Sequence, residues 1–152
     1  MPISSGAFVG RDVTVEFSIA DESAVVGSLS WSLLGMMRGK SMKTNWDDTD
    51  TTADSSPAYT KTQLVTFKMV EFSGDGVSYA DTSYNQKTLR AHVISPGAGT
   101  NSQPKAWLRL TDPDGSVYTG PFIFTSWEDG RQHDGASTWS VSAKSNGAVT
   151  FA

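Results

Sequence analysis

The amino-acid sequence predicts a mainly β protein, an antiparallel β-sandwich or barrel with one flanking α-helix and a long loop. Three observations support this fold class. Several stretches alternate apolar and polar side chains with a period of two, as half-buried strands do. Ser, Thr, Gly, Val, Phe and Trp are conspicuous, whereas Leu and Ala are not dominant. A single stretch has a credible helical pattern, so packed layers of sheet are the natural architecture.

The first forty residues suggest an arm followed by two strands. Residues 1–10 have little periodicity and are expected to form an N-terminal arm. A second strand is expected over residues 29–37, which are apolar on both faces near their end. Between them the stretch RDVTVEFSIA alternates cleanly, and its inward-facing residues are Val13, Val15, Phe17 and Ile19.

Residues 39–59 predict one long polar loop, because they contain few strand or helix signals. Loops longer than about 12–15 residues are uncommon in compact domains, and they usually carry function or are disordered. Trp46 is an unusual residue for a loop that lies wholly in water. This segment is therefore a functional candidate rather than a simple connection.

The strand expected over residues 64–72 raises the question of what covers it. Its two faces carry Val65, Phe67 and Met69 on one side, and Leu64, Val70 and Phe72 on the other. A sheet face in contact with water should be mostly polar. Both faces of this strand therefore need cover, from the helix or from another subunit.

The rest of the chain predicts a helix and two hairpins. The helix spans residues 83–92, and Asp81, Thr82 or Ser83 could cap it. The turn 112–115, DPDG, joins one pair of strands, and residues 145–147 are expected to close a final hairpin. The large aromatic residues expected in the core are Phe67, Trp107, Phe122 and Trp139.

Bulk properties exclude several function classes. The 152 residues suggest one domain spanning 1–152. A net charge of −4 argues against a grip on nucleic-acid phosphates, which needs clustered basic residues. The absence of cysteine excludes disulfides, thiolate catalysis and cysteine-based zinc sites. Residues 1–13 show no signal peptide, and no apolar run approaches the roughly 18 residues that span a bilayer.

The candidate chemical sites all have simpler explanations. Asp47, Asp48, Asp50 and Asp54 could bind a cation such as calcium, but their spacing fits no complete motif, so a solvated or subunit-contacting loop is favoured. No G-x-S-x-G nucleophile elbow of a hydrolase occurs in the sequence, so His92 and His133 are expected to be ordinary packing or surface residues. The glycine-rich stretches precede no Walker lysine. We therefore expect no enzymatic activity, no metal and no cofactor.

The order of motifs resembles that of the tail tube proteins, or major tail proteins, of long-tailed, non-contractile bacteriophages. The resemblance covers most of the chain beyond residue 40. Its specificity lies in the order of the stretches and in the ending, because no stretch is a chemical signature by itself. The stretches are NWDDTDTTAD (45–54), LVTFKMVEFSGDGVS (64–78), YNQKTLRAHVI (84–94), WLRLTDPDG (107–115), GPFIFTSW (120–127) and TWSVSAKSNGAVTF (138–151).

The resemblance implies a structural virion protein that assembles into stacked rings, commonly hexameric, around a channel for DNA. The implied partners are other copies of the chain, a tape measure protein, tail tip and terminator proteins, and phage DNA that passes without specific binding. The implied location is the virion tail, with the host cytoplasm before assembly. On this reading the segment 39–59 is an assembly loop, and the candidate inter-subunit contacts are Trp46, Asp47, Asp48 and Asp50.

One alternative remains open at this point. A receptor-binding or carbohydrate-binding β-sandwich of a virion would have a similar composition. Such a module would need an exposed aromatic platform and no self-assembly. Trp46 and Trp127 lie near expected loops and are the two tryptophans that could be exposed.

Overall fold

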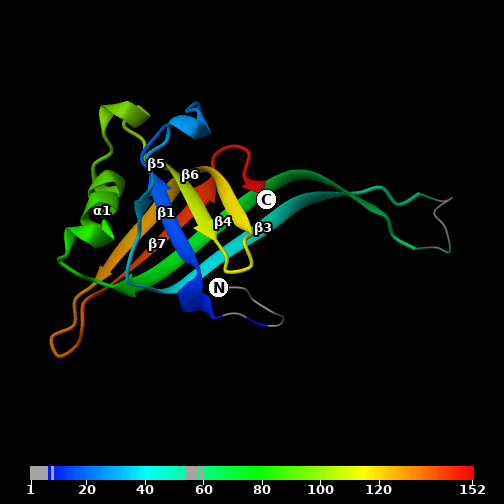
Figure 1. The fold of residues 1–152 in the computed structure, drawn as a ribbon. Helices are drawn as coiled ribbons and strands as arrows, with labels where there is room; N and C mark the ends of the chain where they lie inside the picture. Colours follow the sequence, from blue (N-terminus) through cyan, green and yellow to red (C-terminus); the bar gives the residue numbers. More distant parts are fainter. Residues whose placement is uncertain (1–6, 8, 54–57, 59) are drawn as a thin grey trace.

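The computed structural model describes residues 7, 9–53, 58 and 60–152. Within these ranges eight strands join into one antiparallel sheet in the order β2-β1-β5-β6-β7-β4-β3, and β8 pairs with β6 (Figure 1). The mainly β fold class with one α-helix is confirmed, and the sheet is not closed. The strands are β1 (Thr14–Ser18), β2 (Ser32–Leu33), β3 (Met37–Asp50), β4 (Gln63–Val77), β5 (Lys105–Thr111), β6 (Val117–Gly130), β7 (Thr138–Ser145) and β8 (Thr150–Phe151).

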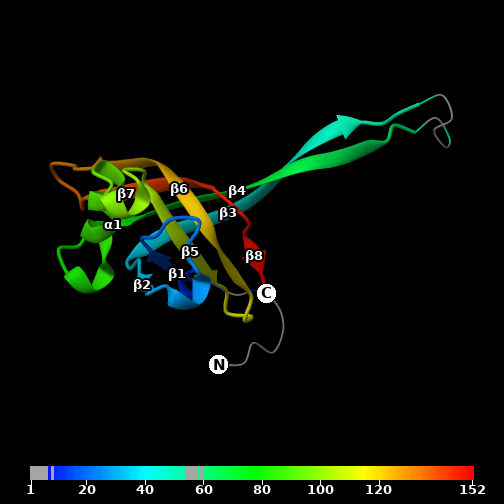
Figure 2. The same ribbon diagram turned by 90° about the horizontal axis from the view of Figure 1, so that it is seen from above.

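The sheet curls around a continuous apolar core to which β1, β4, β5, β6 and β7 all contribute (Figure 2). Trp139 is fully buried and stacks on Trp127 with the ring centroids 5.0 Å apart. Trp107 and Phe122 are also buried, so three of the four expected core aromatics are confirmed. Trp127 is half-buried by this stacking and offers no exposed platform.

Hydrogen bonds from the Lys40 and Trp107 side chains link the curled sheet to the segments on either side of β1. The Lys40 ammonium on β3 donates to the carbonyl oxygens of Gly10 and Val13, at 3.0 and 2.7 Å, and so ties β3 to the segment that leads into β1. Partial burial lowers the pKa of Lys40. On the other side, the Trp107 indole donates to the Asp21 carbonyl, which holds the loop after β1 against β5.

The helix α1 (Gln86–Ile94) starts three residues later than expected. A short 3₁₀ turn, Thr82–Tyr84, precedes it, and the Asp81 side chain caps this turn by accepting from the Ser83 N–H, whereas α1 itself follows Asn85 without a side-chain cap. Asn85 has a φ of 58°, in the left-handed region, which separates the turn from the helix. Leu89 is buried in the core. Among the described residues, no helix is long and apolar enough to cross a membrane.

Three other expectations about the strands are wrong. β1 ends at Ser18, so Ile19 lies beyond the strand and is exposed. The strand expected over 29–37 is reduced to β2, because Met36 adopts a φ of 59° that turns the chain before β3. The end of the chain does not form a hairpin with β7. Instead β8 pairs with Tyr118 and Thr119 of β6, on the edge that β7 leaves open.

The segment expected as a long loop is mostly a strand. Residues 37–50 form β3, which pairs with β4 from Met37 opposite Gly76 to Asp50 opposite Gln63. Residues 51–53 and 58 of that segment are described outside any strand, whereas residues 54–57 and 59 lie outside the described residues, as do residues 1–6 and 8 of the expected N-terminal arm.

Candidate assembly surface

β3 and β4 extend beyond the body of the protein as a two-stranded ribbon (Figures 1 and 2). β7 pairs with β4 only from Glu71 to Val77, and its last residue, Ser145, accepts from the Val70 N–H at 3.0 Å. Beyond that point β4 pairs with β3 alone. We call residues 45–50 and 63–69 the arm.

The arm exposes large apolar side chains. Phe67, expected in the core, is 76% exposed, because no layer of the described body lies over this part of the ribbon. The expectation of burial was therefore wrong for this residue. The other exposed apolar side chains of the arm are Leu64 (61%), Val65 (51%), Trp46 (51%) and Met69 (42%). The described chain therefore covers the part of β4 that lies beside β7, and it leaves the part that belongs to the arm exposed to solvent.

Backbone pairing and a few side-chain contacts hold the two strands of the arm together, although the β3 strand is polar in sequence. The Thr66 hydroxyl donates to the Asp47 carbonyl at 3.2 Å. The register shifts between Trp46 and Asp48, where a β-bulge interrupts the pairing. The Lys68 ammonium lies 5.6 Å from the centre of the Trp46 ring, within the range of a cation–π contact. Backbone pairing thus holds the two strands together while their side chains stay in water.

The acidic residues of the arm are exposed beside the apolar ones. Asp47, Asp48 and Asp50 are all exposed. Hydrogen bonds from Thr52 lower the pKa of Asp50, and the Thr52 N–H lies 2.8 Å from its carboxylate. Among the described residues, no group of three or more His, Cys, Asp or Glu side chains is placed to share a metal ion. Asp54, the fourth member of the expected cluster, lies outside the described residues.

Within the described ranges, the polar contacts of the two histidines involve no candidate nucleophile. His92 is buried, and its Nε2 lies 2.7 Å from the Lys105 carbonyl oxygen, so it joins α1 to β5. His133 lies in the exposed loop before β7 with its Nε2 3.8 Å from Asp134. His92 is thus a packing residue, and His133 is a solvent-exposed loop residue.

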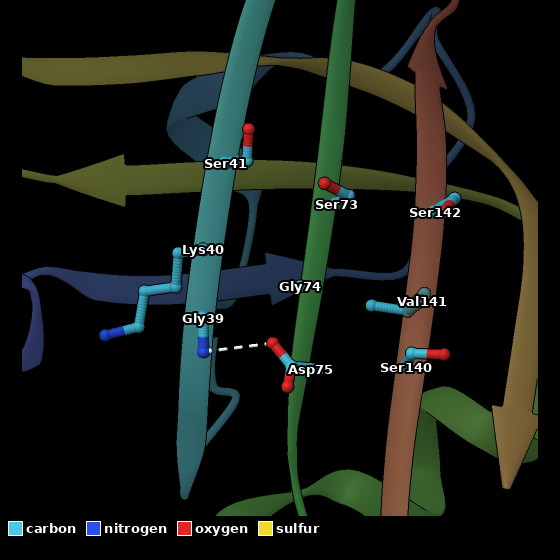
Figure 3. Close-up of a pocket in the computed structure, with 9 residues that line it drawn as sticks. All are labelled: Gly39, Lys40, Ser41, Ser73, Gly74, Asp75, Ser140, Val141 and Ser142. Carbon is cyan, nitrogen blue, oxygen red and sulfur yellow. Dashed lines mark hydrogen bonds between the residues drawn. The ribbon is translucent and has the colours of Figure 1, made fainter.

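A shallow depression of about 420 Å³ lies on the outer face of β3, β4 and β7, close to the end where β3 begins and β4 ends (Figure 3). Ser41, Ser73 and Ser142 stand in register across the three strands. The Asp75 carboxylate accepts from the Gly39 N–H at 3.1 Å, and the Lys40 side chain points away from the depression. These small and already bonded groups offer no convergent catalytic set.

Solved structures with this fold come from tail and injection assemblies. A gene transfer agent tail, determined with C6 symmetry, is 20% identical over 96% of this chain and 99% of that chain, with a TM-score of 0.71. The SPP1 tail tube is 14% identical over 95% and 78%, with a TM-score of 0.63. A subunit of the sheath–tube complex of an extracellular contractile injection system is 9% identical over 98% and 93%, with a TM-score of 0.61. These likenesses establish the fold.

Sequence comparison gives the family. No curated protein sequence matches the chain. The sequence profile described as phage tail tube protein matches residues 7–151, which is nearly the whole chain and includes the body, the arm and β8. The chain therefore belongs to the phage tail tube protein family.

Proposed function

We propose that this chain is the repeating subunit of a tail tube, that it polymerises into stacked rings, and that the arm makes the contact between rings. The observation that carries this proposal is the arm itself. Five large apolar side chains stand exposed on a ribbon whose outer edges are unpaired within the described chain. Large apolar side chains left exposed in this number, on both faces of one ribbon, mark an interaction site.

The energetics of a two-stranded ribbon favour cover from another subunit. An isolated hairpin is only marginally stable in water, and an exposed edge strand is a template for pairing with another chain. The outer edge of β3 runs for 14 residues without a partner strand in the described ranges. Packing against a neighbouring copy would bury the apolar side chains and satisfy this edge. A tube subunit has such neighbours on every side.

Rings of six subunits are the expected assembly, because the tail of the gene transfer agent with the same fold was determined with C6 symmetry. A heterologous, head-to-tail contact that does not close on itself produces an extended filament, as stacking of rings requires. Assembly would place the chain in the tail of the virion. A tape measure protein within the tube, and tip and terminator proteins at its ends, are the further partners we propose.

The charge of the subunit suits a conduit for DNA. With 16 acidic and 12 basic side chains, the chain has a net charge of −4 and would repel the phosphate backbone. DNA would then pass through the lumen without specific binding. A structural role of this kind requires no catalysis and no cofactor.

The alternative of a sugar-binding module is less favoured. A stacking platform needs aromatic rings gathered on one accessible face. Here Trp107 and Trp139 are buried, Trp127 stacks on Trp139, and Arg109 lies over the Trp31 ring at 4.5 Å. The exposed Trp46 stands on the ribbon instead.

The test is to compare Trp46→Ala with the wild type in thermal unfolding and in tube formation by negative-stain electron microscopy. An aromatic anchor at an interface commonly contributes about 2 kcal/mol or more, so each contact should weaken by roughly 30-fold. We expect a normally folded subunit that forms no tubes. Trp46→Phe is the matched control, because it keeps an apolar ring, and it should retain tubes.

Two outcomes contradict the proposal. Normal tubes from Trp46→Ala would remove the residue from assembly. Loss of both fold and tubes would show that Trp46 supports the subunit's own structure.

A further inference from the structure

Head-to-tail stacking requires two different surfaces on each subunit, one that donates and one that accepts. The arm is the donor under the proposed function, and the inference that follows rests on that proposal. The accepting surface should lie at the opposite end of the molecule from the arm. It should be apolar where it meets the apolar side chains of the arm, and basic where it meets the aspartates.

The base of the β3–β4 hairpin is the opposite end. β3 begins at Met37 opposite Gly76, near the end of β4, whereas the arm lies at the Asp50–Gln63 end of the same two strands (Figure 1). The 14 residues of β3 span roughly 40 Å at the usual rise of a strand. A copy displaced along the strand direction by about this length would bring its arm to the base of its neighbour.

The base carries an exposed apolar patch, which we define as Leu33, Met36, Tyr79 and the half-buried Tyr84. Hydrogen bonds hold its parts together, since the Asn85 amide donates to the Leu33 carbonyl at 2.8 Å and the Gly35 N–H donates to the Tyr84 carbonyl at 3.0 Å. The rings of Tyr79 and Tyr84 meet edge to face, with centroids 5.4 Å apart. Leu33, Met36 and Tyr79 are between 37% and 46% exposed.

A groove of about 530 Å³ adjoins this patch along the first turns of α1. Tyr79 belongs to both the patch and the groove, so the two surfaces are continuous. Lys87 lines the groove and is exposed, and Arg90 lines it while it pairs with Asp129 at 3.8 Å. Asp81 stands at the same groove and accepts from Ser83.

The charges of the two ends are complementary. The arm presents Asp47, Asp48 and Asp50 beside its apolar side chains, and the groove presents the exposed Lys87, together with Arg90 in its pair with Asp129, beside the apolar patch. Charge complementarity of this kind fixes orientation and register at an interface, and like charges suppress wrong pairings. The single acid of the groove, Asp81, has a matching cation on the arm in Lys68.

We propose that the base patch and the α1 groove together receive the arm of a second copy of this chain. Trp46 of the arm, which shares a face of the ribbon with Lys68, packs against Leu33, Met36 and Tyr79, and Asp48 faces Lys87 and Arg90. The arm and its acceptor are then the two halves of one repeating contact along the tube.

The direct test uses the absence of cysteine from the sequence, because introduced thiols are then the only ones that can be cross-linked, and the single variants reveal any link between identical positions. Thr49→Cys places a thiol on the exposed arm without altering Trp46 or Phe67, and Ala80→Cys places one in the groove. A chain with both substitutions is assembled and treated with a short bismaleimide. We expect a ladder of covalent oligomers on a denaturing gel, and only monomers from either single variant.

The matched control pairs Thr49→Cys with Ala148→Cys, which is exposed between β7 and β8 and away from the base. Its ladder should be at least tenfold weaker. Tubes that give no ladder for the 49–80 pair, or a ladder of equal strength for the control, would overturn the acceptor assignment and leave the role of the arm intact.

Charge reversal provides a second measurement that needs no thiol. Lys87→Glu and Asp48→Lys, each alone, should lower the mass of sedimentable tube at least fivefold with unchanged thermal unfolding. The double variant should recover at least half of the wild-type yield. A double variant that assembles no better than the single variants would count against the proposed pairing of arm and groove.

Discussion

The two halves of strand β4 carry similar side chains in different surroundings. From Glu71 to Val77 the strand lies between β3 and β7, and Val70 and Phe72 are buried. From Gln63 to Met69 it pairs with β3 alone, and Phe67 is mostly exposed. Periodicity therefore shows where a strand forms, whereas the neighbouring strands and layers decide whether its apolar side chains stabilise the subunit or remain free for assembly.

The largest difference between the two halves should appear in the free energy of unfolding. Phe72→Ala opens a cavity in the core and should cost about 3–5 kcal/mol. Phe67→Ala removes an exposed ring and should change stability by no more than about 0.5 kcal/mol, while it impairs tube formation. Denaturant unfolding of both variants provides the measurement. Equal losses would mean that the arm is part of the cooperative fold of the subunit.

A smaller effect should distinguish two glycines in the body half of β4. A methyl group at Gly76 would overlap the Met36 carbonyl oxygen, which belongs to the backbone and cannot turn aside. A methyl group at Gly74 would meet chiefly the end of the flexible Met37 side chain. Gly76→Ala should therefore destabilise the protein by about 1–3 kcal/mol, and Gly74→Ala by less. Thermal unfolding that ranks them in the reverse order would show that the base of the hairpin is loosely packed.

The smallest effect should appear in acid. The backbone and side-chain hydrogen bonds from Ser83 lower the pKa of Asp81 at the base, and those from Thr52 lower the pKa of Asp50 in the arm. A carboxylate with a lowered pKa contributes stability that is present above its ordinary value of 3.8 and is lost as the pH falls through the folded-state value. Asp81→Asn should reduce the acid sensitivity of unfolding below pH 3.8.

Asp50→Asn is the counterpart of that variant in the arm. It should leave the pH dependence of unfolding nearly unchanged, because this part of the ribbon lies outside the packed body. If the two substitutions altered the acid branch of the stability curve equally, the distinction between body and arm would fail.

Sequence reasoning located the elements whose signals are local. The DPDG turn joins β5 to β6 as expected, and its Gly115 has a φ of 92°, which suits glycine. Trp107, Phe122 and Trp139 are buried because their strands lie inside the sheet. Asp81, one of three candidate caps for the helix, instead caps the 3₁₀ turn that precedes it.

The errors arose where long-range pairing decides the structure. β3 is rich in Ser, Thr, Asn and Asp and lacks an apolar face, so it resembles a loop, yet its pairing with β4 makes it a strand. The end of the chain pairs with β6 instead of β7, which no local turn signal reveals. For the candidate contact, Trp46 was singled out correctly as exposed, whereas Phe67 was placed in the core. Its alternating pattern gave no sign that the body ends at Val70.

The most direct test of the account is hydrogen exchange at the backbone amides of residues 63–69, measured in the dispersed subunit and in assembled tubes. In the dispersed subunit the edge of β4 that faces away from β3 has no partner strand along this segment within the described chain. We predict fast exchange there, and slowing of at least tenfold in tubes, where a neighbouring copy covers the arm. Equal exchange in the two states, whether fast or slow, would contradict the claim that the arm is completed by another subunit.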